Sequence, residues 1–417
     1  MSASNIRFGQ GVTREVGMDL RDMQARRVLL VIDPVLVALP TGETVIESLK
    51  ENRIDFDLFD EVRVEPTDQS FQAAAETATA GGYDAFVAVG GGSSIDTAKA
   101  ANLYSTYPAD FFEYVNAPIG KGRPIPGPLK PLIAIPTTAG TGSETTGVAI
   151  FDYLEQKAKT GIAHRYLKPT LGIVDPDNTR TLPPMVAAST GTDVLSHAIE
   201  SYTALPFDRR PKPPRPQERP AYQGSNPISD VWALKALELA NAYFIRAVRD
   251  PRDEEARGQM LLAAALAGIG FGNAGVHLPH GMSYPVAGMV REYRPEGYAV
   301  DHAMVPHGMS VILNTPAVAR FTAPADPQRH LRAAAALGAD VSGVAPGEAG
   351  DLLAERVIYF MKELRIPNGL AAVGYTDDDI PALVEGTLPQ HRVTKLSPIE
   401  AGEQELTELF QNSMRIW

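Results

Sequence analysis

The chain contains no cysteine among its 417 residues. This absence excludes disulfide bonds, zinc–thiolate sites and iron–sulfur clusters, so any metal must be held by nitrogen and oxygen ligands. The first residues, Met-Ser-Ala-Ser-Asn-Ile-Arg-Phe-Gly, lack the apolar core of a secretory signal, and no apolar run reaches the length of a membrane span. We therefore expect a soluble, cytoplasmic protein without a membrane partner.

An excess of basic residues is also absent. The chain has 38 Lys and Arg against 50 Asp and Glu, which gives a formal net charge of −12. A surface that binds nucleic acid requires a clustered basic excess, so nucleic acid is not expected as the main partner. With 44% hydrophobic residues, the chain is long enough for two domains with their own cores. An enzyme that acts on small molecules is the default expectation.

Short apolar runs alternate with helical patterns in the first part of the chain. The apolar runs are rich in β-branched residues and end in turn residues, which is typical of buried parallel strands. They cover residues 27–33, 84–90, 131–136 and 170–174. Helical patterns at 42–52 and 70–80 lie between them, and this alternation predicts an α/β fold with a mostly parallel sheet.

Strand signals fade after about Pro183. Long helical segments rich in Ala and Leu follow, for example at 231–248 and 254–271. The sequence therefore predicts two domains, an α/β domain over residues 1–183 and an all-helical domain over residues 184–417.

A glycine-rich loop follows one predicted strand. Residues 85–89 run into Gly90-Gly-Gly-Ser-Ser-Ile-Asp96, which continues as a helix. Such a turn offers a pyrophosphate unpaired N–H groups and a positive dipole end, although glycines also occur there for packing alone. A second loop, Pro136-Thr-Thr-Ala-Gly-Thr-Gly-Ser-Glu144, carries hydroxyl groups after the next strand. Together the loops predict a dinucleotide at the carboxyl edge of the sheet. The candidate cofactor-binding residues are Gly91, Gly92, Ser93, Asp96, Thr137, Thr138, Thr141 and Ser143.

Asp33 and Lys159 are two further candidates for cofactor contacts. Asp33 ends the first strand, where a carboxylate could accept hydrogen bonds from an adenosine ribose and would repel a 2′-phosphate, which favours NAD over NADP. An aspartate at this place could instead cap the next helix. Lys159 could contact the ribose or the nicotinamide, but most lysines are simply solvated.

The pentapeptide Pro-His-Gly-Met-Ser occurs twice, at residues 279–283 and 306–310. A glycine beside each histidine would let the backbone approach a bound group, so two such turns could aim two imidazoles at one point. Asp193 and His197 are four residues apart and share one face of a predicted helix. One carboxylate and three neutral imidazoles suit a divalent first-row metal, with room for water or substrate. The predicted ligands are Asp193, His197, His280 and His307.

Two features of this region leave alternatives open. His277 and His280 form a His-x-x-His pair that could itself bind a metal, and we prefer His280 because a glycine follows it. Residues 206–227 are too rich in proline for a helix or a central strand, which favours a surface excursion. The second interpretation of this segment is that one of its basic residues reaches over the active site. Its candidates are Arg209, Arg210, Lys212, Arg215 and Arg219.

These motifs together resemble those of the iron-containing (group III) alcohol dehydrogenases. The resemblance rests on Gly90-Gly-Gly-Ser-x-x-Asp96, Pro136-Thr-Thr-x-Gly-Thr-Gly-Ser-Glu144, Asp193-x-x-x-His197, His280-Gly and Pro306-His-Gly308, and it spans nearly the whole chain. It implies a dehydroquinate synthase-like fold, with an N-terminal NAD-binding α/β domain and an all-helical metal-binding domain. It also implies Fe(II) as the metal, although zinc or another divalent ion suits the same ligands. A homodimer is the assembly that we expect.

Longer strings resemble one branch of this family, the hydroxyacid–oxoacid transhydrogenases. They cover residues 63–67, 219–230, 268–277 and 369–375. Many alcohol dehydrogenases of the group have a second histidine in the sequence His-Gly-x-x-His-Pro, where this chain has His280-Gly-Met-Ser-Tyr-Pro285. Tyr284 therefore replaces a histidine linked to proton transfer. Tyr284 and His277 are the candidate catalytic residues.

The resemblance implies an oxidoreductase that moves hydride through bound NAD. The donor would be a hydroxyacid such as 4-hydroxybutyrate, and the acceptor an oxoacid such as 2-oxoglutarate. The metal would act as a Lewis acid on the substrate oxygen, while the protein aligns the reactants and excludes water. Because both substrates are carboxylates, a guanidinium clamp is expected, with the Pro/Arg-rich segment as its candidate source. The alternative is an NAD-dependent alcohol or hydroxyacid dehydrogenase that releases free NADH.

Overall fold

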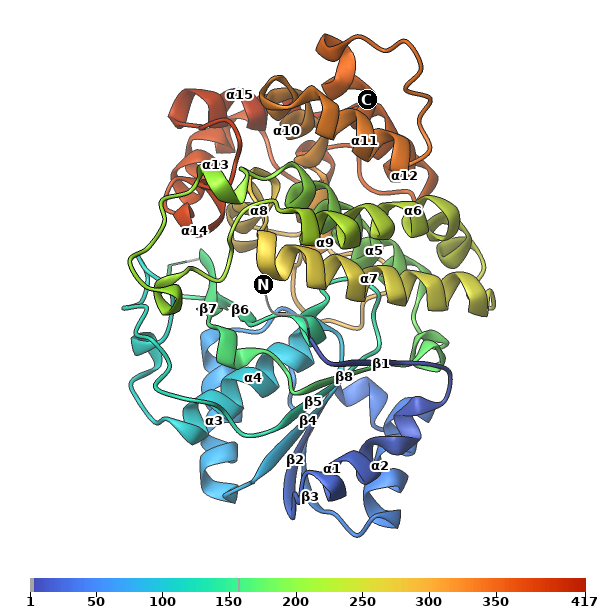
Figure 1. Ribbon diagram of the computed structural model, residues 1–417, viewed down its shortest axis with the longest axis vertical. Helices are drawn as coiled ribbons and strands as arrows, with labels where there is room; N and C mark the ends of the chain where they lie inside the picture. The colour runs from blue at the N-terminus through green and yellow to red at the C-terminus, as the bar shows by residue number, and fades with distance from the viewer. Residues whose placement is uncertain (1–3, 157) are drawn as a thin grey trace. The chain divides into compact units, whose positions relative to one another are not determined.

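The computed structural model describes residues 4–156 and 158–417 (Figure 1). The chain forms two compact units, Met1–Leu182 and Pro183–Trp417, which we call the α/β unit and the helical unit. Each unit has its own secondary-structure class, as the change in sequence pattern near Pro183 predicts.

The α/β unit is built on a six-stranded sheet whose strand pairs are all parallel. Across the sheet the order is β1 (Ile6–Phe8), β8 (Leu171–Val174), β5 (Leu132–Pro136), β4 (Ala85–Gly90), β2 (Arg27–Ile32) and β3 (Asp55–Phe59). The predicted α/β fold with a parallel sheet is therefore confirmed. The chain runs outward from β2 to β3 and then returns to the other side of β2 with β4. The direction of winding thus reverses between β2 and β4, the place where open α/β sheets bind ligands.

Alternation along β2 explains how helices cover both faces of this sheet. Val28, Leu30 and Ile32 pack with apolar residues of α1 (Val16–Asp22) and α2 (Pro40–Glu51). The intervening Leu29 and Val31 pack on the opposite face with α3 (Asp68–Gly81) and α4 (Gly92–Thr106). Figure 1 shows the two helix pairs on opposite sides of the strands.

An antiparallel hairpin in the same unit was not predicted from the sequence. It consists of β6 (Val148–Tyr153) and β7 (Ala158–Ala163), with Asp152 opposite Lys159. Its polar and charged residues obscure the apolar signal that marks the buried strands of the main sheet.

The helical unit contains eleven α-helices and no named strand in its described residues. They are α5 (Pro184–Thr203), α6 (Pro227–Arg249), α7 (Glu254–Ala274), α8 (Leu278–Gly288), α9 (His307–Ile312), α10 (Thr315–Thr322), α11 (Pro327–Ala336), α12 (Ala349–Glu363), α13 (Ile380–Thr387), α14 (His391–Thr394) and α15 (Glu403–Met414). Helix α5 is buried almost throughout and packs against α6, α7 and α9. It is the central element of the unit.

The Pro/Arg-rich segment lies mostly on the surface of the helical unit. It forms only two short 3₁₀ turns, Phe207–Arg209 and Pro216–Glu218, and Arg209, Lys212, Arg215 and Arg219 are exposed. Among the described residues no single helix is long and apolar enough to cross a membrane. Helices α7 and α8 reach the required length and composition only as a pair that bends by 105°.

Candidate functional site

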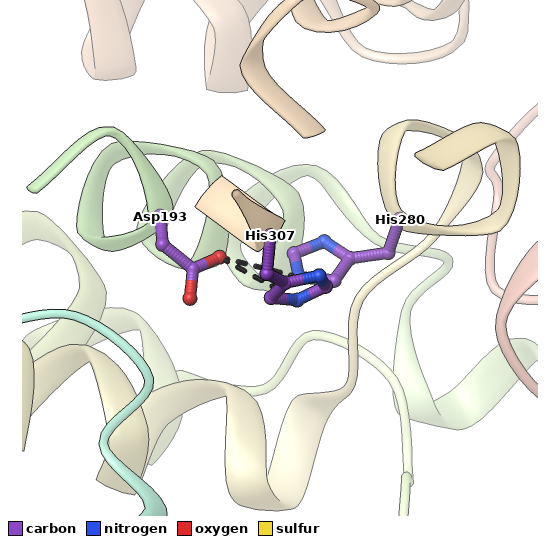
Figure 2. A group of neighbouring side chains, drawn as sticks. All are labelled: Asp193, His280 and His307. Carbon is purple, nitrogen blue, oxygen red and sulfur yellow. Dashed lines mark ion pairs between the residues drawn. The ribbon is translucent and has the colours of Figure 1, made fainter. Parts of the chain in front are cut away.

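Asp193, His280 and His307 converge inside the helical unit (Figure 2). One potential ligand atom from each lies within 4.8 Å of the other two. Asp193 Oδ1 is 3.6 Å from His280 Nε2 and 3.9 Å from His307 Nε2. A carboxylate and two imidazoles at this spacing leave room between them for one cation.

Three separate helices position these side chains. Asp193 lies in the middle of α5, His280 in the first turn of α8, and His307 is the first residue of α9. The two His-Gly sequences therefore begin helices and do not form the predicted turns. A Cβ at Gly308 would lie 2.1 Å from the Ser189 carbonyl oxygen and 2.8 Å from Asp193 Cβ, so this glycine lets α9 start directly against α5. The glycine serves helix packing, whereas we predicted that it admits a bound group.

His197 lies one turn after Asp193 and beside the group of three. Its Nε2 is 3.5 Å from Asp193 Oδ1, and its ring stacks on His280 with centroids 4.8 Å apart. The other face of the ring stacks on Phe271 at 3.8 Å. Phe271 and His280 thus hold the His197 ring beside the carboxylate, although His197 is not a member of the three-residue group.

The polar atoms at this point fit a divalent metal. Both carboxylate oxygens of Asp193 and Nε2 of His280 are buried, and within the described part of the chain they have no hydrogen-bond partner. Burial alone would raise the pKa of Asp193, but His197, His307 and His280 outweigh burial and lower it, so the carboxylate is an anion. A buried anion without donors is costly unless a cation compensates it. The nitrogen and oxygen donors are those that first-row divalent ions take.

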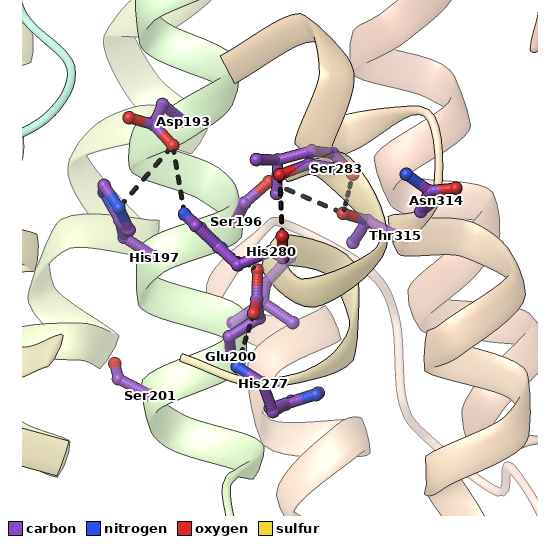
Figure 3. A network of polar contacts seen from close by, with 12 residues as sticks. Asp193, Ser196, His197, Glu200, Ser201, His277, His280, Ser283, Asn314 and Thr315 are labelled. Carbon is purple, nitrogen blue, oxygen red and sulfur yellow. Dashed lines mark hydrogen bonds and ion pairs between the residues drawn. The ribbon is translucent and has the colours of Figure 1, made fainter. Parts of the chain in front are cut away.

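Glu200 orients the metal-binding group, and the sequence analysis missed it (Figure 3). This fully buried residue accepts a 2.6 Å hydrogen bond from His280 Nδ1. The bond fixes the ring so that Nε2 points towards Asp193, as carboxylates behind metal-binding histidines usually do. Burial lowers the pKa of His280, but Glu200 and Asp193 outweigh it and raise this pKa to about 10, so a metal would take the place of the proton on Nε2. The spacing i, i+4, i+7 of Asp193, His197 and Glu200 is a helical signal that could have revealed it.

The two candidate catalytic residues, His277 and Tyr284, lie outside the group of three. The backbone N–H of His277 donates to Glu200 at 2.7 Å, and its Nε2 is 3.1 Å from Thr203 Oγ1. Burial lowers the pKa of His277 to about 4. Tyr284 is buried one turn after His280 on α8, and its hydroxyl accepts a 2.9 Å hydrogen bond from Arg392. Their catalytic roles stay predictions.

In the α/β unit, the glycine-rich loop follows β4 at the point where the winding reverses. Gly90 has φ +146°, and a Cβ there would lie 2.2 Å from Ser94 Oγ and 3.4 Å from Asp33 Cβ. The loop leads into α4, which no side chain caps within the described residues. The first turn of α4 and the ends of β2 and β4 therefore have the arrangement that is typical of an anion-binding edge.

The second loop packs against the first. A Cβ at Gly91 would lie 3.1 Å from Thr138 Oγ1, and one at Gly92 would lie 2.7 Å from Thr141 Cγ2. The backbone N–H of Thr137 donates to the Gly90 carbonyl at 3.0 Å. The packing interpretation of these glycines is therefore supported, because they make space for the adjacent loop, and the pyrophosphate contact stays a prediction.

Several candidate cofactor residues bind other protein groups. Asp96 accepts hydrogen bonds from Ser143 at 2.5 Å and from the Ile150 backbone at 2.9 Å. Lys99, which the sequence analysis missed, is fully buried and donates to Ser143 at 2.5 Å and to the Val148 carbonyl at 2.7 Å. The three side chains join α4, the second loop and the hairpin, which is a positioning role.

The remaining candidates also have local partners. Lys159 is buried and forms ion pairs with Glu65 at 2.6 Å and Asp152 at 2.9 Å. Ser93 Oγ accepts a 3.2 Å hydrogen bond from the Glu65 backbone. Asp33 caps the short turn after β2 by accepting from the Val35 N–H at 2.9 Å, and burial raises its pKa. The alternative interpretation of Asp33 as a cap is thus realised, and the ribose contact stays a prediction.

Comparisons with known proteins agree with this arrangement. The family model described as iron-containing alcohol dehydrogenase matches residues 3–176, and the model of the family's C-terminal part matches residues 221–414. A hydroxyacid-oxoacid transhydrogenase of Xenopus tropicalis is 59% identical over all of this chain and 90% of its own length. Its human counterpart is 57% identical with the same coverage. The structure of a sulfoacetaldehyde reductase from Bifidobacterium kashiwanohense with NAD⁺ superposes with a TM-score of 0.80, at 26% identity, covering 99% of this chain and 98% of that one.

The expected cytoplasmic location is wrong. Both transhydrogenase relatives are named as mitochondrial proteins, and this finding contradicts the expectation. The expectation relied on the lack of an apolar signal segment, but peptides that direct import into mitochondria are amphipathic rather than apolar. The lack of an apolar segment therefore does not distinguish a cytoplasmic protein from one that is imported into mitochondria.

The similarity is continuous over both units and includes the segments that carry the group of three and the two loops. The relatives are 59% and 57% identical over the whole of this chain. The chain belongs to the iron-containing alcohol dehydrogenase family.

Proposed function

We propose that the protein is a metal- and NAD-dependent hydroxyacid–oxoacid transhydrogenase. The observation that carries the proposal is the buried Asp193 carboxylate, which faces imidazole nitrogens and lacks hydrogen-bond donors among the described residues. The substrate class follows from the names of the full-length relatives. In the net reaction, a hydride and a proton pass from 4-hydroxybutyrate to 2-oxoglutarate, giving succinate semialdehyde and 2-hydroxyglutarate.

Each part of the chain has a defined task in this proposal. Asp193, His197, His280 and His307 would hold the metal, and Glu200 would keep His280 in the tautomer that presents Nε2. The loops after β4 and β5 would hold NAD through the first turn of α4 and the Thr137 and Thr138 side chains. A bound divalent metal would supply Lewis-acid polarisation of the substrate oxygen, and the nicotinamide would supply the hydride acceptor. Fe(II) is the ion that the family name suggests.

Tyr284 is the candidate for moving the proton of the substrate hydroxyl. It lies on the same helix as His280, one turn further along, so the two Cα atoms are about 6 Å apart along the helix axis. His277 is buried behind Glu200 and contacts Thr203, so we assign it to the support of Glu200.

Product formation without added nucleotide tests the proposal. Purified protein loaded with Fe(II) is incubated with 4-hydroxybutyrate and 2-oxoglutarate, and 2-hydroxyglutarate is quantified. We expect many turnovers per protein molecule, because the cofactor is retained and reoxidised in place. Protein stripped with a chelator and protein reloaded with zinc are the controls for metal identity. Activity that requires added NAD and releases free NADH would instead establish an ordinary dehydrogenase.

A further inference from the structure

Arg392 is a half-buried residue whose guanidinium has no acidic partner among the described residues of the helical unit. Its Nη2 donates to the Tyr284 hydroxyl at 2.9 Å, and its guanidinium lies 5.2 Å from the centre of the Tyr222 ring. Nη1 is buried and has no hydrogen-bond partner among the described residues. No carboxylate of the described chain lies within ion-pair distance of this guanidinium. A buried charge in this state is expensive, and an anion that comes from outside the chain would compensate it.

Helix packing places Arg392 beside the helix that carries the candidate metal ligand His280. A Cβ at Gly281, the residue after His280, would lie 2.7 Å from Thr394 Cγ2, so α14 packs on α8 beside His280. Arg392 lies two residues before Thr394 and reaches Tyr284, one helical turn beyond His280. The guanidinium of Arg392, on α14, is therefore hydrogen-bonded to a tyrosine that lies one turn from a candidate metal ligand on α8.

We infer that Arg392 binds the substrate carboxylate. It would thereby select substrates in which the carboxylate lies at the right distance from the reacting carbon. This inference rests on the proposed function. In 4-hydroxybutyrate the carboxylate carbon is three bonds from the carbon that bears the hydroxyl group. In 2-oxoglutarate the distal carboxylate carbon is also three bonds from the keto carbon. One guanidinium at a fixed place can therefore bind both substrates, and its planar fork matches the two carboxylate oxygens.

The Pro/Arg-rich segment is the rival source of this clamp. Four of its basic residues are exposed, and the half-buried Arg210 donates to the Tyr222 carbonyl oxygen. Both arginines are half-buried and donate to one protein oxygen, but of the two only Arg392 has a buried donor, Nη1, without a partner among the described residues. This difference favours Arg392.

A substrate series on the unaltered protein is the first test. 4-Hydroxybutyrate is compared with its neutral amide, and with acids one carbon shorter and one carbon longer. We expect kcat/KM to fall at least about tenfold for the amide, because a hydrogen bond between charged groups is lost. The two other chain lengths should also be poorer substrates. Equal values for the acid and its amide would overturn the inference.

The second test compares Arg392→Gln with Arg356→Gln, which removes a similar tyrosine-stacked guanidinium on α12. We expect Arg392→Gln to raise the KM for 4-hydroxybutyrate and the Kd for 2-oxoglutarate, measured by calorimetry, about 10- to 100-fold. Arg392→Gln should oxidise the neutral amide as the unaltered protein does. In Arg356→Gln, the KM for 4-hydroxybutyrate and the Kd for 2-oxoglutarate should both be unchanged. An equal loss for acid and amide would mean that Arg392 only supports the fold, and a loss in Arg210→Gln instead would assign the clamp to the Pro/Arg-rich segment.

Binding separates this inference from the proposed function. If the unaltered protein forms no 2-hydroxyglutarate, the proposed function fails, while the 2-oxoglutarate affinities of the protein and of Arg392→Gln still test the clamp. If Arg392→Gln does not fold by circular dichroism, Arg392→Lys replaces it, because lysine keeps the charge but loses the fork. Arg392→Lys should weaken binding of the acid and leave the amide unaffected. Failure of the unaltered protein to bind 2-oxoglutarate would overturn the inference.

Discussion

At the scale of single residues, the metal-binding group depends on a carboxylate that does not belong to it. Glu200 accepts from His280 Nδ1 and from the His277 backbone, so one buried side chain fixes both the ring orientation and the start of α8. The network in Figure 3 thus extends from Asp193 to Glu200 along one face of α5. Removing the charge of Glu200 should affect metal binding more than folding.

We expect Glu200→Gln to weaken metal affinity about 10- to 100-fold, the usual effect of losing a carboxylate behind a metal-binding histidine. The measurement is competition for Zn(II) or Co(II) with a coloured chelator. Ser201→Ala is the matched control, because Ser201 is equally buried on the same helix and bonds only to the Ala198 carbonyl in the contacts described here. An unchanged affinity in Glu200→Gln would show that His280 needs no such support.

The same residues show what a sequence can and cannot reveal about a site. Asp193, His197, His280 and His307 were identified because their residue types are those of metal ligands and because the His-Gly pair is repeated. Glu200 is marked only by its helical spacing from Asp193 and His197, and Arg392 carries no mark at all, since basic residues are common on helices. The role of Glu200 depends on its buried contact with His280, and that of Arg392 on the lack of a nearby carboxylate among the described residues, and only the folded chain defines these neighbours.

At the scale of secondary-structure elements, close packing of helices sets the geometry of the site. Helix α9 can begin directly against α5 because Gly308 has no side chain, and a Cβ there would collide with Ser189 and Asp193. The predicted reason for this glycine was contact with a bound group. The sequence could not show this packing role, because it does not reveal that α5 is the element that comes close to Gly308.

Gly308→Ala should displace α9 and with it His307. We expect a loss of at least about 2 kcal/mol in unfolding free energy, as for overpacking in a core, together with a clear loss of metal affinity. Urea unfolding and the metal competition assay measure the two effects. Gly347→Ala is the control, since a Cβ there meets nothing within 4 Å. If the Gly308→Ala variant kept both properties, α9 would have to shift without cost.

Lys99 has a comparable role in the α/β unit, where it ties α4 to the second loop and to β6. Lys99→Met keeps the length of the side chain but removes its bonds to Ser143 and the Val148 carbonyl. We expect NAD affinity to fall about tenfold, because positioning of the loop is lost, while metal affinity is unchanged. Fluorescence titration with NADH measures the nucleotide affinity, and the metal competition assay measures the metal affinity. Loss of metal affinity as well would indicate general unfolding.

At the scale of the whole molecule, sequence patterns predicted the architecture well. Buried parallel strands are continuous apolar runs, so β2, β4, β5 and β8 were evident, and the change to Ala/Leu-rich helices marked the helical unit. The hairpin of β6 and β7 was missed because residues such as Asp152 and Lys159 face each other as an ion pair. Location was predicted wrongly, since the apolar signal that we sought is not the one that mitochondrial import uses.

The stability of the whole chain should depend on pH through Glu144, at the end of the second loop. Burial raises the pKa of this carboxyl from its usual 4.5 to about 7. The folded chain therefore keeps a proton that the unfolded chain releases, so this contribution to stability is present below pH 4.5 and is lost as pH rises to about 7. Glu144→Gln removes the free-energy cost of ionising this buried carboxyl. The shift in its pKa corresponds to about 3 kcal/mol of unfolding free energy above pH 7.

Urea unfolding of the full chain at pH 5 and pH 8, followed by circular dichroism, checks this expectation. Glu144→Gln should gain stability relative to the unaltered protein at pH 8 and gain much less at pH 5. The difference between the two proteins is the quantity to follow, because other buried groups such as Asp193 and Glu200 have lowered pKa values and change stability in the opposite direction. A difference that is the same at both pH values would mean that Glu144 is already ionised in the folded chain, and that Lys99 compensates its charge.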